Sequence, residues 1–137
     1  MSISLIVTTY NRPDALLLVL KSIECQILPP SEVIIADDGS DERTKNLISD
    51  FNSQSNLEII HSFHEDLGFR AAESRNKAIS ISKSDYIILV DGDTILHPEF
   101  IADHLKNAKF GFFIQGSRAL LSEKKTKDVI KRQQLFF

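Results

Sequence analysis

The sequence predicts an α/β fold in which a mostly parallel, Rossmann-like sheet of about five strands is flanked by helices. Short apolar runs alternate with helical patterns along the chain, and the links between them are short. Two of the apolar runs, residues 33–36 and 86–90, are continuous rather than alternating, which is typical of strands covered on both faces. These features favour parallel strands joined by helical crossovers.

Each element follows from a local pattern in the chain. The expected strands occupy residues 3–7, 33–36, 57–60, 86–90 and 110–114. The expected helices occupy residues 13–27, 42–51, 71–82, 98–108 and 122–132, the last of them basic. In the first helix, Pro13 suits the opening turn, and one apolar stripe is formed by Leu16, Val19, Leu20, Ile23 and Ile27.

The length of 137 residues fits a single domain. We expect residues 1–117 to form the core of βα units and residues 118–137 to form a basic helical tail. The chain ends on the apolar residues 135–137, whereas natural tails are usually polar. We therefore expect the tail to lead into a C-terminal half that is missing from this sequence.

The composition narrows the class of protein. Apolar residues make up 42% of the chain and charged residues 26%, so a packed core is expected and disorder is not. The net charge of −3 gives no electrostatic reason to expect a nucleic-acid partner. The N-terminus lacks a basic leader, and no apolar stretch approaches the roughly 20 residues that span a bilayer. We expect a cytoplasmic protein, with any peripheral membrane association made through the missing half.

The single cysteine and the four histidines carry no metal-site spacing. Cys25 has no partner for a disulfide within the chain, and its apolar neighbours predict a small core residue on a helix. His104 falls on the apolar face of its helix and is expected in the core, whereas His97 precedes a proline and is expected in a turn. None of the histidines is assigned to a metal.

Polar residues follow three of the expected strands. In open parallel sheets, ligands bind beyond the carboxyl ends of the strands, which meet at one edge. The three clusters are Thr8 to Asn11 after the first strand, Asp37 with Asp38 after the second, and Asp91 with Asp93 after the fourth. Their shared position predicts a binding site at this edge.

Asp91 and Asp93 are the candidate metal ligands. In an extended stretch, residues two apart project from the same face, and paired carboxylates suit a hard cation such as Mn²⁺ or Mg²⁺. Gly92 between them lets the backbone turn or a ligand approach closely. Such a cation could hold a diphosphate and take up charge on a leaving nucleotide. The alternative is a solvated turn after a buried strand.

The first two clusters suit a nucleotide. Asp37 or Asp38 could accept a hydrogen bond from a base or ribose, although an Asp-Gly turn with a helix cap explains the same residues. Tyr10 could stack on a planar base, and Asn11 and Arg12 could hydrogen-bond the base or a phosphate. The alternative for these residues is a helix-entry loop, and the glycine fingerprint of dinucleotide sites is absent.

Arg70 and Arg75 flank the start of the third expected helix. Cations near a helix N-terminus oppose its dipole unless an anion sits there. Both are therefore candidates for contacts to a diphosphate, with Arg75 preferred. A surface ion pair is the alternative for Arg70.

Taken together, the clusters resemble the family 2 glycosyltransferases, which have the GT-A fold. The matching stretches, in the same order and spacing, are residues 6–12 (IVTTYNR), 33–40 (VIIADDGS), 66–70 (DLGFR) with 74–78 (SRNKA), and 86–93 (YIILVDGD). The match runs from about residue 3 to residue 108, and residues 115–118 (QGSR) resemble the segment after the metal motif in related bacterial transferases. Four such motifs in order are highly specific.

The resemblance implies a role for each matched position. Thr8, Tyr10 and Asp38 match positions that hold the base, with Asp38 accepting from a uracil-type ring nitrogen. Arg75 matches a diphosphate contact. In the Asp-x-Asp motif, the last carboxylate, here Asp93, binds the metal, and Asp91 faces the ribose and the metal shell.

The implied reaction is inverting transfer of a sugar from a nucleotide diphosphate, UDP by resemblance, to a hydroxyl on a saccharide or lipid-linked acceptor. The metal would stabilise the leaving diphosphate, and a general base would take the proton of the acceptor. The family carries that base in a further C-terminal half, and no residue of this chain is assigned to it. We therefore expect donor binding with little or no transfer by these residues alone.

Three rival functions fit parts of the sequence. A phosphohydrolase of the haloacid dehalogenase type also uses Asp-x-Asp with Mg²⁺, but normally on the first strand and followed by Thr or Val where this chain has Ile95. A non-catalytic module that binds a nucleotide sugar fits the missing half. A structural domain without a ligand would require the four motifs to have arisen together by chance.

Overall fold

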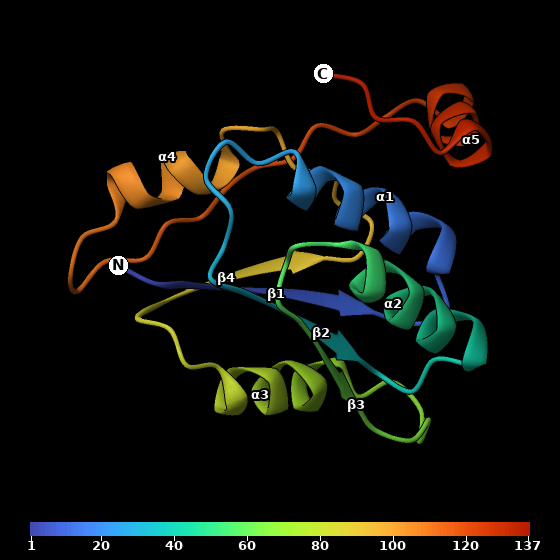
Figure 1. The fold of residues 1–137 in the computed structure, drawn as a ribbon, viewed down its shortest axis with the longest axis horizontal. Helices are drawn as coiled ribbons and strands as arrows, with labels where there is room; N and C mark the ends of the chain where they lie inside the picture. The colour runs from blue at the N-terminus through green and yellow to red at the C-terminus, as the bar shows by residue number, and fades with distance from the viewer.

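Four parallel strands form the centre of the computed structural model, which describes residues 1–137 (Figure 1). The strands are β1 (Ile3–Thr9), β2 (Glu32–Asp37), β3 (Ile59–Phe63) and β4 (Tyr86–Asp91). The helices are α1 (Pro13–Glu24), α2 (Glu42–Gln54), α3 (Ala71–Ile81), α4 (Phe100–Asn107) and α5 (Glu123–Arg132). The strands lie in the order β3-β2-β1-β4, so the chain adds β2 and β3 on one side of β1 and then crosses over to place β4 on the other.

The sheet is covered on both faces. Helices α1, α2 and α4 lie on one face, and α3 lies on the other (Figure 1). The larger core cluster fills the first face, where α1 contributes Leu16, Val19, Leu20 and Ile23 to it. The smaller cluster on the α3 face includes Ala78. This double cover explains why β2 is buried along its whole length.

Short polar signals set the helix boundaries. Pro13 occupies the first position of α1, where its missing N–H leaves no bond unmade. Asp41 caps α2 by accepting from the Arg43 amide, and Ser122 caps α5 by accepting from the Lys125 amide. The basic helix expected at residues 122–132 forms as α5, Glu123–Arg132.

The predicted fifth strand, residues 110–114, does not form. Phe110 and Phe113 are fully or largely exposed. β4 is consequently an edge strand, and an open groove of about 720 Å³ runs between it, α4 and the segment at residues 112–118. An apolar run becomes a strand only where a neighbouring backbone pairs with it, and this run has none.

The prediction that Cys25 is a buried helical residue is also wrong. Helix α1 ends at Glu24, three residues earlier than expected, and Cys25 is exposed at the helix terminus. Ile27, the last residue of the expected stripe, is exposed as well. His104 was expected in the core but is only half-buried: it packs against Phe100 and lines the groove beside β4, and its partial burial lowers the pKa of the imidazole.

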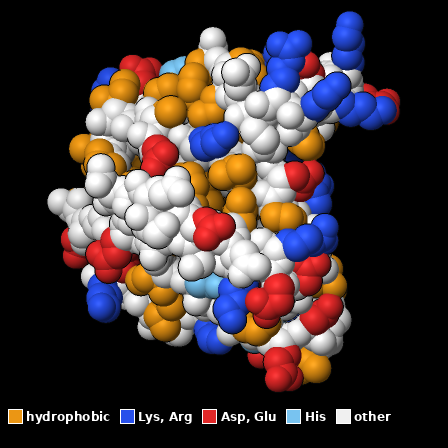
Figure 2. Space-filling view, turned by 45° about the vertical axis from the view of Figure 1, so that its right-hand side comes forward, with side chains coloured by type: hydrophobic (Ala, Val, Ile, Leu, Met, Phe, Trp, Pro, Cys, Tyr) orange, Lys and Arg blue, Asp and Glu red, His pale blue; other side chains and the backbone are white.

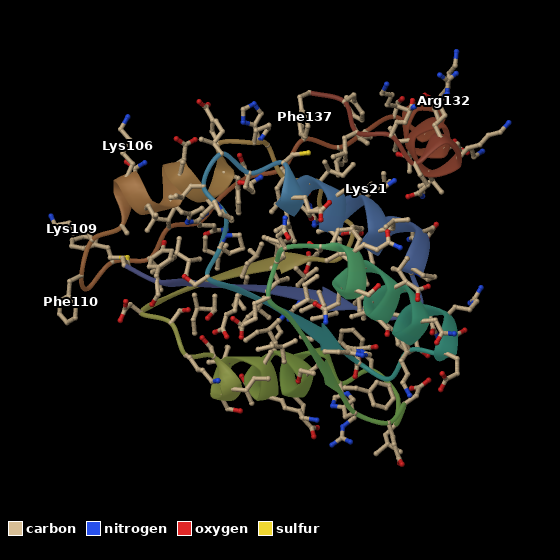
Figure 3. All side chains as sticks on the ribbon, viewed as in Figure 1. Lys21, Lys106, Lys109, Phe110, Arg132 and Phe137 are labelled. Atoms are coloured by element: carbon tan, nitrogen blue, oxygen red, sulfur yellow. The ribbon has the colours of Figure 1, made fainter.

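Helix α5 lies on α1 at the periphery of the molecule (Figure 1). Val129 is buried, and Lys21 of α1, labelled in Figure 3, donates from its ammonium group to the Gln133 carbonyl at 2.8 Å. Figure 2 shows lysine and arginine side chains gathered at the corner where α5 projects. No helix of the chain combines the length and apolar character that crossing a membrane would require.

Candidate functional site

The three polar clusters meet at one edge of the sheet, as the sequence predicts. All strands are parallel, so all their carboxyl ends lie on the same side. The register sets Thr8 beside Asp91 across the β1–β4 pair, and Thr9 beside Asp37 across the β1–β2 pair. Residues more than 80 positions apart in the sequence are thereby brought into contact.

Asp91 is the centre of one half of this edge. Its Oδ1 accepts a hydrogen bond from the Thr8 hydroxyl at 3.2 Å and lies 3.5 Å from Nη2 of Arg75. Its Oδ2 lies 3.3 Å from Nη1 of Arg118. The carboxylate is still about half exposed, at 49%. Two guanidinium groups that flank an accessible carboxylate offer N–H donors to an anion.

The strand ends at Asp91, and the following residues turn. The Thr94 amide donates to the Asp91 carbonyl at 3.1 Å, which closes the turn. The prediction that Asp91 and Asp93 share one extended stretch is therefore wrong, because Asp93 lies inside this turn. Asp93 is exposed and makes no ion pair. Its carboxylate is available to a ligand from solvent.

Gly92 allows a close approach between β1 and this turn. A Cβ atom built at Gly92 would lie 2.4 Å from the Thr8 carbonyl oxygen, a distance that real Cβ atoms do not tolerate. Gly92 is buried, so neither backbone has free space into which it could move. The glycine is required here for packing, which agrees with the close approach expected at this position.

The donor atoms at this turn suit a hard cation. No three His, Cys, Asp or Glu side chains of the chain come together as a ready-made metal cage. Mg²⁺ and its analogues are commonly bound by one or two carboxylates, with water and phosphate oxygens completing the shell. Asp91 and Asp93 can supply carboxylates of that kind, and Arg75 and Arg118 lie beside Asp91.

Asp37 ends β2 and Asp38 follows it; both are buried, but their partners differ. Asp37 is 1% exposed: its Oδ1 accepts from the Ser40 amide at 2.9 Å, and its Oδ2 lies 2.8 Å from Nε2 of His61. Burial opposes ionisation of Asp37, but the hydrogen bonds from His61 and Ser40 outweigh it and lower the pKa of the carboxyl group. Asp37 is therefore an internal brace of the β2–α2 turn.

Asp38 lies on the side of the turn that faces the β3–α3 connection. Its Oδ1 is 2.6 Å from Nε2 of His64, and its Oδ2 accepts from the Arg70 amide at 2.9 Å. Gly39 follows with φ of 92°, where a Cβ atom would lie 2.5 Å from the Asp66 backbone. The turn and the connection are thus in direct contact.

Tyr10 extends from the β1–α1 loop over the same region. Its hydroxyl donates to Oδ2 of Asp66 at 2.7 Å, and 48% of the residue remains exposed. The hydrogen bond from Tyr10 and another from the Gly68 amide lower the pKa of Asp66. A phenol held by its hydroxyl leaves the ring available for stacking on a planar group.

Asn11 is bonded to the β2–α2 turn, whereas Arg12 has a local partner. The Asn11 amide donates to the Ser40 hydroxyl at 2.9 Å, and its side-chain oxygen accepts from the Asp41 amide at 2.8 Å. Asn11 therefore ties the β1–α1 loop to the β2–α2 turn, and it adopts the left-handed backbone region, with φ of 49°. Arg12 pairs with Asp14 at 3.2 Å on the surface.

The two arginines around α3 are placed differently. Arg75 reaches Asp91, with Nη2 at 3.5 Å from Oδ1. Arg70 stands at the N-cap position of α3, where its guanidinium pairs with Glu73 and its backbone amide holds Asp38. The surface ion pair considered for Arg70 is the arrangement that forms.

Several residues of this edge were not assigned a role from the sequence. His61 and His64 were recognised only as unsuited to metal binding, and Asp66 and Arg118 only as parts of matched stretches. A signal that could have found the histidines is that both follow the apolar run at residues 57–60 within four positions, at the carboxyl end of an expected strand. Their partners depend on the strand order, which the sequence does not display.

Carboxylates, arginines and an exposed tyrosine thus lie together at one edge of a parallel α/β sheet. The family model described as "Glycosyl transferase family 2" matches residues 4–134. The chain therefore belongs to glycosyltransferase family 2, and the predicted GT-A fold is confirmed. The assignment also overturns the phosphohydrolase alternative, consistent with the position of Asp91 on the fourth strand rather than the first.

The chain is similar in sequence to one known synthase, and in sequence and fold to a solved transferase structure. The hyaluronan synthase of Pasteurella multocida is 35% identical over 104 residues, which is 75% of this chain and 10% of that protein. The structure of TarS residues 1–349 from S. aureus in complex with UDP-GlcNAc matches with a TM-score of 0.66 and 26% identity, over 77% of this chain and 30% of the other.

A third likeness concerns the fold alone. The mannosyltransferase PcManGT of Pyrobaculum calidifontis, in complex with GDP-Man and Mn²⁺, matches with a TM-score of 0.69 and 21% identity, over 76% of this chain and 31% of the other. This chain thus spans about a third or less of the length of these relatives.

Proposed function

We propose that this chain forms the donor-binding part of a metal-dependent, inverting glycosyltransferase. The observation that carries the proposal is the placement of Asp91: it lies between Thr8, Arg75 and Arg118 at the sheet edge that also holds Tyr10 and Asp38. A nucleotide diphosphate needs a planar-ring contact, a hydrogen-bond acceptor and neutralisation of the phosphates, and this edge offers all three.

The base would bind between Tyr10 and Asp38. The exposed Tyr10 ring provides a stacking surface, and Asp38 provides the acceptor for a ring N–H. The base of the proposed nucleotide site is formed by Thr8, Asn11 and Gly92. Asp37 stabilises the β2–α2 turn behind Asp38. Arg12 and Arg70 stand at the rim, where their surface ion pairs could open to a phosphate. A uridine nucleotide fits a carboxylate acceptor, and a UDP-sugar is the donor we propose.

The diphosphate would lie beside Arg75 and Asp91. Asp91 and Asp93 would hold Mn²⁺ or Mg²⁺, and the bound cation would supply electrostatic stabilisation of the leaving diphosphate. Arg75 and Arg118 would orient the phosphates and share their charge. The hydroxyl of a saccharide or lipid-linked acceptor would attack the anomeric carbon from the opposite side, which inverts the configuration.

The acceptor half of the reaction is proposed to depend on residues outside this sequence. No side chain at the described edge is assigned as the general base. We therefore expect the 137-residue chain to bind the donor while transferring sugar slowly or not at all. Rapid transfer to an acceptor by this chain alone would contradict that expectation.

Calorimetric titration with UDP, with and without Mn²⁺, tests the proposal. We expect Mn²⁺ to strengthen binding of UDP to the wild type and to have no such effect on Asp93→Ala. In the presence of Mn²⁺, the variant should therefore bind UDP about tenfold or more weakly than the wild type. Asp50→Ala, which removes an exposed carboxylate of α2, is the matched control and should leave binding unchanged. If no nucleotide diphosphate binds the wild type, the proposed function is wrong.

A further inference from the structure

Asp38, the proposed base acceptor, is held by two groups from one loop. His64 contacts its Oδ1 at 2.6 Å, and the Arg70 amide donates to its Oδ2 at 2.9 Å. Both partners lie in the β3–α3 connection. The carboxylate of Asp38 is 8% exposed and the His64 imidazole 15%, so the pair is largely shielded from water.

The chemistry of this pair fixes which way the proton lies. An ionised carboxylate only accepts hydrogen bonds, so a contact of 2.6 Å requires Nε2 of His64 to carry the hydrogen. Each carboxylate oxygen keeps a second lone pair after accepting one bond. Asp38 can therefore be held by His64 and Arg70 and still receive a further donor from a ligand.

The loop that carries His64 is itself fixed in place. The Asp66 backbone packs against Gly39, where a side chain on that glycine would collide with it, and Asp66 accepts the hydroxyl of Tyr10. His64 thus sits on a connection that is tied on one side to the β2–α2 turn and on the other to the stacking tyrosine.

We propose that His64 is a positioning residue for recognition of the nucleotide base. By donating from Nε2, it stops rotation of the Asp38 carboxylate and directs the free lone pairs of Asp38 at the ring N–H of a uracil-type base. The inference rests on the proposed function, because it takes Asp38 as the acceptor for that ring N–H. It adds that selection of the base is set by the β3–α3 loop as well as by Asp38.

His61, three residues before His64 and within β3, provides a matched control. It pairs with Asp37 at 2.8 Å, as His64 pairs with Asp38, but Asp37 is 1% exposed and its other oxygen is bound to Ser40. Loss of His61 should therefore weaken the turn without changing how a base is discriminated.

The test compares binding of UDP and of its N3-methyl analogue, which lacks the ring N–H, in the presence of Mn²⁺. We expect the wild type to prefer UDP by about 10- to 100-fold, as for loss of a hydrogen bond to a charged group. His64→Phe should reduce this preference to about threefold or less, whereas His64→Gln, which retains a side-chain N–H, should restore most of it. His61→Phe should keep the full preference.

Two results would overturn the inference while leaving the proposed function intact. One is a wild type that prefers UDP together with a His64→Phe variant that keeps the same preference. The other comes from nitrogen-15 NMR of the wild-type imidazoles, which needs no variant to fold: a His64 ring with the hydrogen on Nδ1 and a bare Nε2 could not donate to Asp38. A wild type that binds no nucleotide would instead reject the proposed function itself.

Discussion

The hydroxyl of Tyr10 donates a hydrogen bond to Asp66 at 2.7 Å and so joins two loops that lie 56 residues apart in the sequence. The bond fixes the exposed ring of Tyr10, which follows the carboxyl end of β1. It also links the stacking group to the loop that holds Asp38. The β1–α1 loop and the β3–α3 connection therefore both hold the proposed base site in place.

This bond should be visible in the titration of Tyr10. The hydrogen bond to Asp66, together with the negative charge of Asp66, raises the pKa of the Tyr10 phenol. Asp66→Asn removes the charge, so we expect the pKa of Tyr10 to fall toward its ordinary value. The chain has two tyrosines and no tryptophan, so phenolate absorbance measured in a Tyr86→Phe background reports Tyr10 alone. An unchanged titration in Asp66→Asn would show that the bond does not persist in solution.

Replacement of Gly92 by alanine should destabilise the sheet edge. The added methyl group would lie 2.4 Å from the Thr8 carbonyl oxygen, so β1 and the turn after β4 must separate. We expect a loss of about 1–3 kcal/mol in the free energy of unfolding, measured by urea denaturation. Gly116→Ala is the matched control because no atom lies within 4 Å of its added Cβ, and it should change stability little. Equal stability of the two variants would be inconsistent with this packing.

Gln26 should matter for stability although it lies outside the site. Its side-chain amide donates to the carbonyls of Ser22 and His97, and its oxygen accepts from the Ile101 amide at 3.1 Å. The buried side chain thus joins the end of α1 to the chain on either side of the α4 start. We expect Gln26→Ala to cost about 1–3 kcal/mol in unfolding free energy, because buried backbone groups lose their partners. The exposed Gln54 of α2 is the control position, and Gln54→Ala should fall within about 0.5 kcal/mol of the wild type.

Asp37 should make stability depend on pH in the acidic range. Its pKa is lower in the folded chain than in the unfolded one, so the unfolded chain takes up the proton more readily. The stabilisation is therefore present above the ordinary carboxyl pKa of about 4 and is lost as pH falls through the lower folded value. Urea midpoints measured from about pH 6 down to pH 3 should fall less steeply for Asp37→Asn than for the wild type. Parallel pH profiles would exclude Asp37 as a source of the acid sensitivity.

Local sequence patterns were sufficient to predict most helices and strands, but not which elements pair or pack with one another. The helices beginning at Pro13, Glu42 and Ala71 were predicted at their observed first residues, because proline placement, capping and apolar periodicity act within a few neighbours. The apolar run at residues 110–114 was predicted as a strand and is not one, because strand formation also requires a second backbone. The prediction that Cys25 is buried is wrong for a related reason: burial depends on where α1 ends and on what packs there.

The sequence by itself determined the alternation of strands and helices and placed Thr8, Asp38 and Asp91 at strand ends, since periodicity and motif order are local properties. Only the tertiary structure decided that β1 lies between β2 and β4, which brings Asp91 to Thr8 and Arg75. It alone paired His61 with Asp37 and His64 with Asp38, across the β2–β3 contact. Such pairs depend on register between strands distant in the chain, and that register is set by the packing of the whole sheet rather than by any short segment.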